Sequence, residues 1–328
     1  MTQRQVKIKR ERWPLRVPFR ITGKEWIDLD VIVVHVTENG HTGRGEAAGV
    51  FYIGEDQISM ESAARAIASD IERGLSRAEL QDALGCGGAR NAVDCALWDL
   101  ECKLQGKTIW ERLNVTPRPV STVATVGILK TPKLMAQRAA ELSAFPTLKI
   151  KLDGEAPVER VEAIRAARPE AELVIDANQG FTIELLCEVV PHFERMGVAM
   201  IEQPLKRGED EELEGFVSSI PICADESVLD RSEFAAARSR YDMINIKLDK
   251  TGGLTEALAL LAEAKSAGME CMVGNMLGTS LAMAPAIVVA QHCAFCDLDG
   301  PIHLSGDRLG GILYDGPAIA AEPLTLWG

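Results

Sequence analysis

Five charged residues recur at a regular interval, each near the end of a short apolar run. They are Lys151, Asp176, Glu202, Asp225 and Lys247, and they lie 25, 26, 23 and 22 residues apart. One strand followed by one helix needs about this length of chain. We therefore expect the five side chains at equivalent ends of consecutive parallel strands, where they would converge on one face.

Three of these residues are carboxylates on successive predicted strands. Asp176, Glu202 and Asp225 would repel one another at close range unless a cation joined them. A site made only of oxygen ligands, with room for water and substrate, suits Mg²⁺. The spacing therefore predicts a magnesium site, although a single aspartate at a strand end is more often a helix cap or a solvated turn residue.

Two lysines flank the carboxylates in strand order. Lys151 and Lys247 would stand on either side of a substrate whose carboxylate binds the metal, and the metal would stabilise the enediolate that forms when the α-proton leaves. A lysine acts as a base only if its pKa falls towards neutrality. Mg²⁺ and Lys149, two residues before Lys151 on the same strand face, both act in that direction.

The elements that must position these residues follow from the hydrophobic pattern. From residue 117 to 304, eight short apolar strands alternate with amphipathic helices, which predicts an α/β fold with a parallel barrel and an active site at the carboxyl ends of its strands. Residues 1–116 read instead as strands followed by helices, with a turn at Asn39-Gly40. They predict a separate α+β domain, to which residues from about 305 to 328 return.

Composition excludes several classes of function. The net charge of −13 at pH 7 argues against a nucleic-acid or anionic-membrane surface, and no apolar run approaches the ~20 residues of a membrane helix. Eight scattered cysteines and a highly charged start predict a reduced, cytoplasmic protein without a signal peptide. We expect a small-molecule substrate, and a homo-oligomer is compatible with the sequence.

The motifs around these residues resemble the muconate-lactonising subgroup of the enolase superfamily. The matching segments are Lys149-Ile-Lys151, VIDAN, IEQP, ADES, INIKLDKTGG and the helical ALWDLECKLQGKTIWERL. The resemblance implies a modified (β/α)₇β barrel under a capping domain. It also implies metal ligation by Asp176, Glu202 and Asp225, acid–base roles for Lys151 and Lys247, and support from Asn178 and Glu226 within the motifs.

Asp297 and Asp299 distinguish between reactions within that subgroup. The segment Asp297-Leu298-Asp299-Gly300 is similar to the D-x-D motif of dipeptide epimerases, in which both carboxylates receive the substrate's ammonium group. This implies epimerisation of a dipeptide by two-lysine 1,1-proton transfer, with Lys149 among the substrate-binding residues. The alternatives are N-acylamino-acid racemisation, o-succinylbenzoate synthesis, cycloisomerisation, or a non-catalytic metal-binding barrel.

Trp26 bears on side-chain preference. Relatives that act on Ala-Glu place an arginine in the loop equivalent to residues 20–26, and Trp26 stands at its place. A large apolar or cationic second residue suits Trp26, Glu25 and Asp28 better than an acidic one. We therefore expect L-Ala-L-Xaa dipeptides with a hydrophobic or cationic second residue. Packing within the first domain is the competing role for Trp26.

Overall fold

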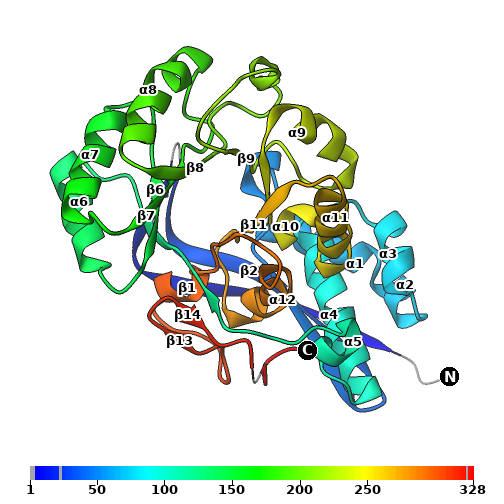
Figure 1. Ribbon diagram of the computed structural model, residues 1–328. Helices are drawn as coiled ribbons and strands as arrows, with labels where there is room; N and C mark the ends of the chain where they lie inside the picture. Colours follow the sequence, from blue (N-terminus) through cyan, green and yellow to red (C-terminus); the bar gives the residue numbers. More distant parts are fainter. Residues whose placement is uncertain (1–3, 22–23, 323) are drawn as a thin grey trace.

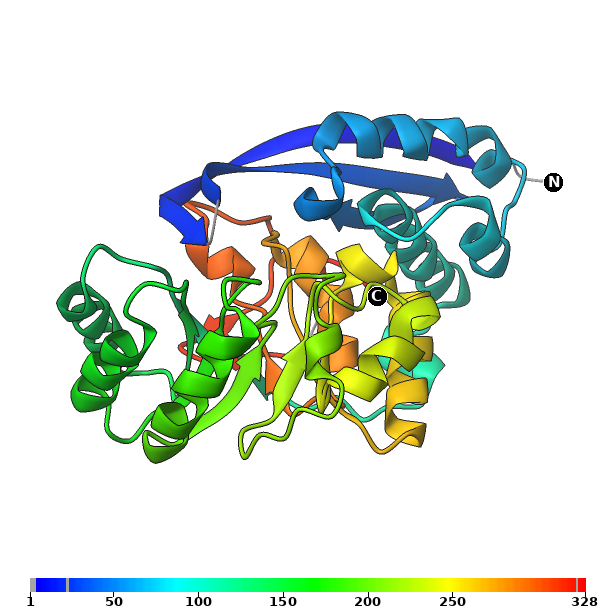
Figure 2. The same cartoon turned by 90° about the horizontal axis from the view of Figure 1, so that it is seen from above.

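A computed structural model of the protein describes residues 4–21, 24–322 and 324–328. It contains a curled sheet of eight parallel strands and, lying across one end of it, a three-stranded antiparallel sheet with its own helices (Figures 1 and 2). The expected α/β barrel with an α+β capping domain is therefore confirmed as a fold class.

Eight parallel strands form the barrel in the order of the chain. They are β5 (Ala124–Val126), β6 (Thr147–Lys151), β7 (Glu172–Asp176), β8 (Val198–Glu202), β9 (Ile222–Ala224), β10 (Met243–Ile246), β11 (Glu270–Val273) and β12 (Phe295–Cys296). The ring closes through a backbone hydrogen bond of 2.8 Å from Val123 N to Cys296 O. Each strand overlaps one of the eight apolar runs predicted between residues 117 and 304.

Helices connect the strands and cover the outside of the ring. They are α6 (Pro132–Glu141), α7 (Pro157–Ala167), α8 (Ile183–Arg195), α9 (Phe234–Arg240), α10 (Leu248–Thr251), α11 (Leu254–Ser266), α12 (Ser280–Ala290) and α13 (Gly300–His303), with 3-10 helices η2 (Glu211–Leu213) and η3 (Arg231–Glu233). The connection between β8 and β9 forms only the short η2. Pro204, Gly208 and Gly215 interrupt this segment, and both glycines have positive φ.

An apolar layer inside the barrel supports the polar residues above it. Val174, Met200, Cys223, Met243 and Met272 form a buried cluster. Since side chains two residues apart share a face of a strand, the polar residues that end β7 and β8 point into the same interior as Val174 and Met200. The polar site therefore rests on a packed floor.

The first domain consists of β1 (Gln5–Ile21), β2 (Lys24–Glu38), β3 (His41–Ala47) and the helices η1 (Phe51–Ile53), α1 (Gln57–Ala66), α2 (Ala68–Glu72), α3 (Arg77–Ala83), α4 (Gly88–Gln105) and α5 (Ile109–Leu113). The turn predicted at Asn39-Gly40 joins β2 to β3, and both of its residues have positive φ. Strand β3 is not evident from the sequence alone, because glycine is unfavourable within strands. A Cβ on Gly43 or Gly45 would lie 2.0 or 2.1 Å from a carbonyl oxygen of α4, so these glycines permit close packing of strand on helix.

The end of the chain contacts helix α4 of the first domain. Trp327 Nε1 donates to Cys95 O at 2.9 Å, and Gly328 N donates to Asp99 Oδ1 at 2.9 Å. Before its last residues, the chain forms β13 (Tyr314–Asp315) and β14 (Ala318–Ile319). These two strands make a small sheet with β4 (Val120–Ser121), which precedes the first barrel strand in the sequence.

Buried polar contacts join the two domains. Asp94, on α4, accepts hydrogen bonds from Thr255 N at 2.9 Å and Thr255 Oγ1 at 2.6 Å, so a side chain of the first domain caps the start of α11. Glu46, on β3, accepts from Thr279 N at 2.8 Å at the start of α12. These carboxylates fix the first domain over the barrel mouth.

No helix within the described part of the chain is long and apolar enough to cross a membrane. All eight cysteines are free thiols.

Candidate active site

The five spaced residues meet at the carboxyl ends of the barrel strands. Lys151, Asp176 and Glu202 are the last residues of β6, β7 and β8, and they are aligned with one another in the sheet register. Asp225 and Lys247 follow directly after β9 and β10. All five are buried, with at most 7% of their surface exposed. The structure therefore brings the whole predicted set together.

Lys149 lies at the centre of this group. Its ammonium is 2.9 Å from Asp176 Oδ2, 2.8 Å from Glu202 Oε2 and 2.8 Å from Asp297 Oδ2. Burial acts to lower the pKa of Lys149, but these carboxylates raise it well above its ordinary value. Lys149 is therefore a fixed cation that holds three carboxylates from different strands.

Lys151 and Lys247 stand on opposite sides of the barrel mouth. Strands β6 and β10 are separated by β7, β8 and β9, and positions four apart in a closed ring of eight face each other. Lys151 Nζ is 2.6 Å from Asp176 Oδ2, and Lys247 Nζ is 2.6 Å from Asp225 Oδ2. Both lysines line one cavity between them. A lysine amine therefore borders each side of that cavity.

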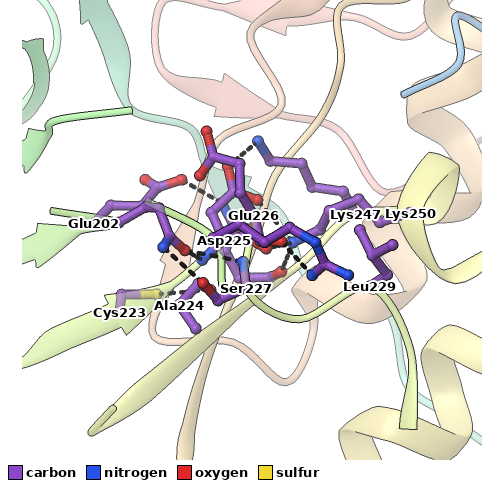
Figure 3. A network of polar contacts seen from close by, with 12 residues as sticks. Glu202, Cys223, Ala224, Asp225, Glu226, Ser227, Leu229, Lys247 and Lys250 are labelled. Carbon is purple, nitrogen blue, oxygen red and sulfur yellow. Dashed lines mark hydrogen bonds and ion pairs between the residues drawn. The ribbon is translucent and has the colours of Figure 1, made fainter. Parts of the chain in front are cut away.

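Asp225 has a second lysine, which sequence reasoning missed. Lys250 Nζ is 2.7 Å from Asp225 Oδ1 (Figure 3). It also donates to Asn245 O at 2.7 Å. Asn245 in turn donates to Glu202 Oε1 at 2.8 Å. The sequence did carry a signal for both residues. Asn245 shares the face of Lys247 by strand alternation, and Lys250 follows Lys247 by three residues, about one helical turn.

Carboxyl groups outnumber lysines in this group. Five buried carboxylates, at positions 176, 202, 225, 226 and 297, face four buried lysines, at positions 149, 151, 247 and 250. Burial and the neighbouring Asp176 raise the pKa of Glu202 to about 7, and burial and Asp225 raise the pKa of Glu226 to about 8. Full ionisation of these carboxyl groups is therefore unfavourable here, and a bound cation would favour it.

Several buried oxygens also lack hydrogen-bond donors. Asn178 Oδ1, Glu226 Oε2 and Asp297 Oδ1 have no partner, and Glu202 Oε2 has the Lys149 ammonium nearby without a hydrogen bond. Among the residues that the structure describes, no three His, Cys, Asp or Glu side chains are gathered as a closed metal cluster, because lysine amines lie between them. The donor chemistry fits a hard divalent cation, provided that these amines withdraw from the ligand oxygens.

Asp297 and Asp299 lie beside this group and line the same cavity. Asp297 Oδ2 accepts a hydrogen bond from Lys149, while its Oδ1 is buried and unpartnered. Asp299 Oδ2 is 3.0 Å from His303 Nε2 and accepts from Thr125 N at 3.3 Å. Burial acts to raise the pKa of Asp299, but His303 lowers it to about 2. Sequence reasoning did not identify this partner on α13.

Aromatic side chains from the first domain form the roof of the cavity. Trp26 lines it together with Phe19, Ile21 and Phe51, and the Trp26 and Phe51 rings meet edge to face at 5.2 Å between centroids. The Lys24 ammonium lies 4.9 Å from the Trp26 ring centroid and 4.3 Å from that of Phe51. Trp26 therefore borders the site and packs within its own domain at the same time.

Two protein families match almost the whole chain. Residues 3–113 match the mandelate racemase / muconate lactonizing enzyme N-terminal domain, and residues 133–317 match the enolase C-terminal domain-like family. L-Ala-D/L-Glu epimerase of Escherichia coli (strain K12) is 43% identical over 93% of this chain and 95% of that protein. N-acetyl-D-glutamate racemase of a Pseudoalteromonas species is 40% identical over 78% of this chain and 81% of that protein.

Two solved structures show the same fold. An enolase family member from Agrobacterium tumefaciens with homology to dipeptide epimerases, with bound sodium and L-Ala-L-Glu, superposes with a TM-score of 0.96 at 41% identity, covering 99% of this chain and 100% of that one. The dipeptide epimerase of Enterococcus faecalis V583, complexed with Mg and L-Leu-L-Tyr, gives 0.90 at 28% identity and covers 97% of both chains. This chain therefore belongs to the mandelate racemase/muconate lactonizing enzyme family of the enolase superfamily.

Proposed function

We propose that this protein is a magnesium-dependent dipeptide epimerase that inverts the Cα next to the substrate carboxylate. The observation that carries this proposal is the placement of Lys151 and Lys247 across a carboxylate-rich barrel mouth. The identity to relatives named as epimerases and racemases supports the same class of reaction, an isomerase reaction at a carbon that bears a proton.

Asp176, Glu202 and Asp225 are the proposed ligands of the magnesium ion. They are buried at the ends of neighbouring strands, and each of the three already holds a lysine ammonium group at 2.9 Å or less. The ion, when bound, supplies positive charge that stabilises the substrate carboxylate as negative charge develops on it. Asn178 and Glu226 border the same cavity and keep their proposed supporting role.

The two lysines divide the proton transfer between the two faces of the substrate carbon. One amine removes the α-proton from its side, and the ammonium opposite delivers a proton to the other side, so that the configuration is inverted. Burial acts to lower the pKa of Lys247, but Asp225 raises it above its ordinary value, so Lys247 becomes a base only when the charge of Asp225 is taken up by another cation. The proposed metal site at Asp225 therefore also prepares this lysine for catalysis.

The amino end of the dipeptide would bind at Asp297 and Asp299. The free Oδ1 of Asp297 is a buried acceptor without a donor, and an ammonium group supplies both the charge and the hydrogen that it lacks. Lys149 holds the opposite oxygen of the same carboxylate, so its contribution to substrate binding is to orient Asp297.

The roof of the cavity supports an apolar second residue. Phe19, Ile21, Trp26 and Phe51 offer a large apolar contact surface to a side chain on the reacting carbon. Glu25 and Asp28, which the preference for a cationic side chain relied on, are not among the described residues that line the cavity. We therefore place L-Ala-L-Xaa dipeptides with a hydrophobic second residue ahead of those with a cationic one.

A second candidate is racemisation of an N-acylated amino acid. One specific observation favours it: Asp297 and Asp299 each already have a cationic partner, Lys149 and His303, at 2.8 and 3.0 Å. An uncharged amide of the substrate could then bind beside Asp297 and Asp299 in place of an ammonium group. The relative named as N-acetyl-D-glutamate racemase points in the same direction.

Exchange of the α-proton in D₂O tests both candidates and the two-lysine mechanism. NMR would follow loss of the α-proton from both epimers of Ala-Leu and from both enantiomers of N-acetylglutamate, with Mg²⁺ present. For the preferred substrate, Lys151→Ala and Lys247→Ala should each reduce interconversion by at least ~10²-fold. Each variant should retain exchange from one stereoisomer only, and the two variants should retain opposite ones.

Lys206→Ala is the matched control, because this lysine is exposed and lies outside the site. Interconversion near the wild-type rate in Lys247→Ala would refute the two-base mechanism. No exchange from any substrate in the wild type would instead support a non-catalytic metal-binding barrel. Exchange of N-acetylglutamate without exchange of Ala-Leu would establish the second candidate.

We also propose the division of the chain into a capping domain of residues 1–116, completed by about 305–328, and a barrel of residues 117–304. The return of Trp327 and Gly328 to α4 supports it. The free thiols of all eight cysteines support a cytoplasmic location.

A further inference from the structure

A second hollow adjoins the candidate active site on the side of Asp299. The cavity between the two lysines has a volume of about 70 Å³, whereas the adjoining hollow has about 510 Å³. Phe19, Thr125 and Asp299 line both. Pockets that bind small molecules usually measure roughly 300–1,000 Å³, so the hollow, and not the inner cavity alone, has the size of a ligand site.

The walls of the hollow combine apolar side chains with uncompensated cations. Its apolar lining consists of Val17, Pro18, Phe19, Ile128, Leu129, Leu142, Phe145 and Ile302. Arg138 pairs with Glu141 at 2.9 Å, and His303 pairs with Asp299 at 3.0 Å. Arg16 and Arg20, both on β1, also line the hollow and have no carboxylate partner within the described chain. The hollow therefore carries an excess of positive charge.

We propose that this hollow binds the side chain of the first residue of the dipeptide and, among side chains longer than that of alanine, favours an acidic one. The inference rests on the proposed function, which places the substrate ammonium at Asp297 and Asp299. The Cα next to that ammonium then lies at the boundary marked by Asp299, so its side chain enters the hollow. Methylene groups would contact the apolar lining, and a terminal carboxylate would pair with the guanidinium groups of Arg16 and Arg20.

The preference should be modest because these arginines are exposed. Arg16 Nε already donates to Leu304 O at 2.7 Å, which leaves its other N–H groups for a ligand. Arg20 is exposed to solvent, where an ion pair is screened by water and salt. A lysine side chain in the same place would meet two cations of its own sign.

Four dipeptides that differ only in the first residue test the proposal. The measured quantity is kcat/KM for α-proton exchange on L-Glu-L-Leu, L-Gln-L-Leu, L-Lys-L-Leu and L-Ala-L-Leu. We expect Glu to exceed its neutral isostere Gln by about three- to fivefold, the size typical of an exposed ion pair, and Lys to fall below Gln. The advantage of Glu over Gln should shrink at high salt.

Variants assign the preference to the arginines. Arg20→Gln, and more strongly Arg16→Gln with Arg20→Gln, should bring the Glu-to-Gln ratio towards one. Arg12→Gln is the matched control, since Arg12 is on the same strand, pairs with Asp30 at 2.7 Å and lies outside the hollow. A wild-type ratio at or below one, or a ratio unchanged in the double variant, would overturn the proposal while Ala-Leu exchange still upheld the proposed function. Failure of all four dipeptides to exchange would overturn both.

Discussion

Asp94 connects the two domains through a carboxylate that is costly to ionise. It is fully buried on α4 and accepts two hydrogen bonds from Thr255 at the start of α11. Burial, only partly offset by those hydrogen bonds, raises its pKa from 3.8 to about 6. Folding stability should therefore depend on pH through this group, and Asp94→Asn should remove that dependence while keeping the side-chain shape.

The direction of this pH dependence follows from proton uptake by Asp94 in the folded state. At pH 8, Asp94 is ionised in the folded and the unfolded chain, and the folded state carries the cost of a buried charge. As pH falls through 6, the folded state takes up a proton before the unfolded chain does, so the free energy of unfolding rises, and the gain is complete below 3.8. One pKa unit corresponds to about 1.4 kcal/mol, so the full effect is roughly 3 kcal/mol, and on the order of 1 kcal/mol between pH 8 and pH 5.

Urea unfolding of the wild type and Asp94→Asn between pH 5 and pH 8 measures this effect. The difference between the two proteins should move in favour of the wild type as pH falls. Asp56→Asn is the matched control: Asp56 is an exposed cap of α1 whose pKa is lowered by its hydrogen bonds with Ser59, so its contribution changes only in more acidic solution. A constant difference between wild type and Asp94→Asn across this range would refute the reasoning.

Three further predictions concern the site itself. Chelation should abolish α-proton exchange, and Mg²⁺ should restore it. Glu202→Gln should weaken the response to Mg²⁺ in a titration of activity. Full activity in excess chelator would contradict the metal assignment. Lys250→Met should lower the free energy of unfolding by about 3–5 kcal/mol in urea, because Asp225 loses a buried partner; unchanged stability would exclude that role. Trp26→Arg should raise kcat/KM for Ala-Glu relative to Ala-Leu, and an unchanged ratio would exclude Trp26 from side-chain selection.

The ring of site residues was predictable because its spacing repeats the length of a structural unit. Short runs such as the one ending at Asp176 are rich in β-branched residues, and a polar residue at the same point of each run must appear on the same barrel face. The resemblance to a known family added roles to these positions. Neither source of information required knowledge of side-chain contacts.

The remaining features depend on contacts between distant segments. Lys149 contacts three carboxylates because the barrel interior is narrow enough for their side chains to meet. His303 reaches Asp299 because α13 turns back after β12. Strand β3 was missed because Gly43 and Gly45 are poor strand residues, and their reason for being there is the backbone of α4 on the opposite side.

The long hairpin of β1 and β2 keeps the residues proposed to contact the substrate side chain apart from the residues proposed to move protons. Strands β1 and β2, of 17 and 15 residues, reach from the helices of the first domain to the barrel mouth (Figure 2). Phe19 and Trp26, on these strands, line the cavity as part of its roof. The groups proposed to move protons come from barrel strands and share no backbone with this hairpin. Mutations near the tip of the hairpin can therefore change substrate preference without displacing the two lysines. The same proton-transfer chemistry can then act on new substrates.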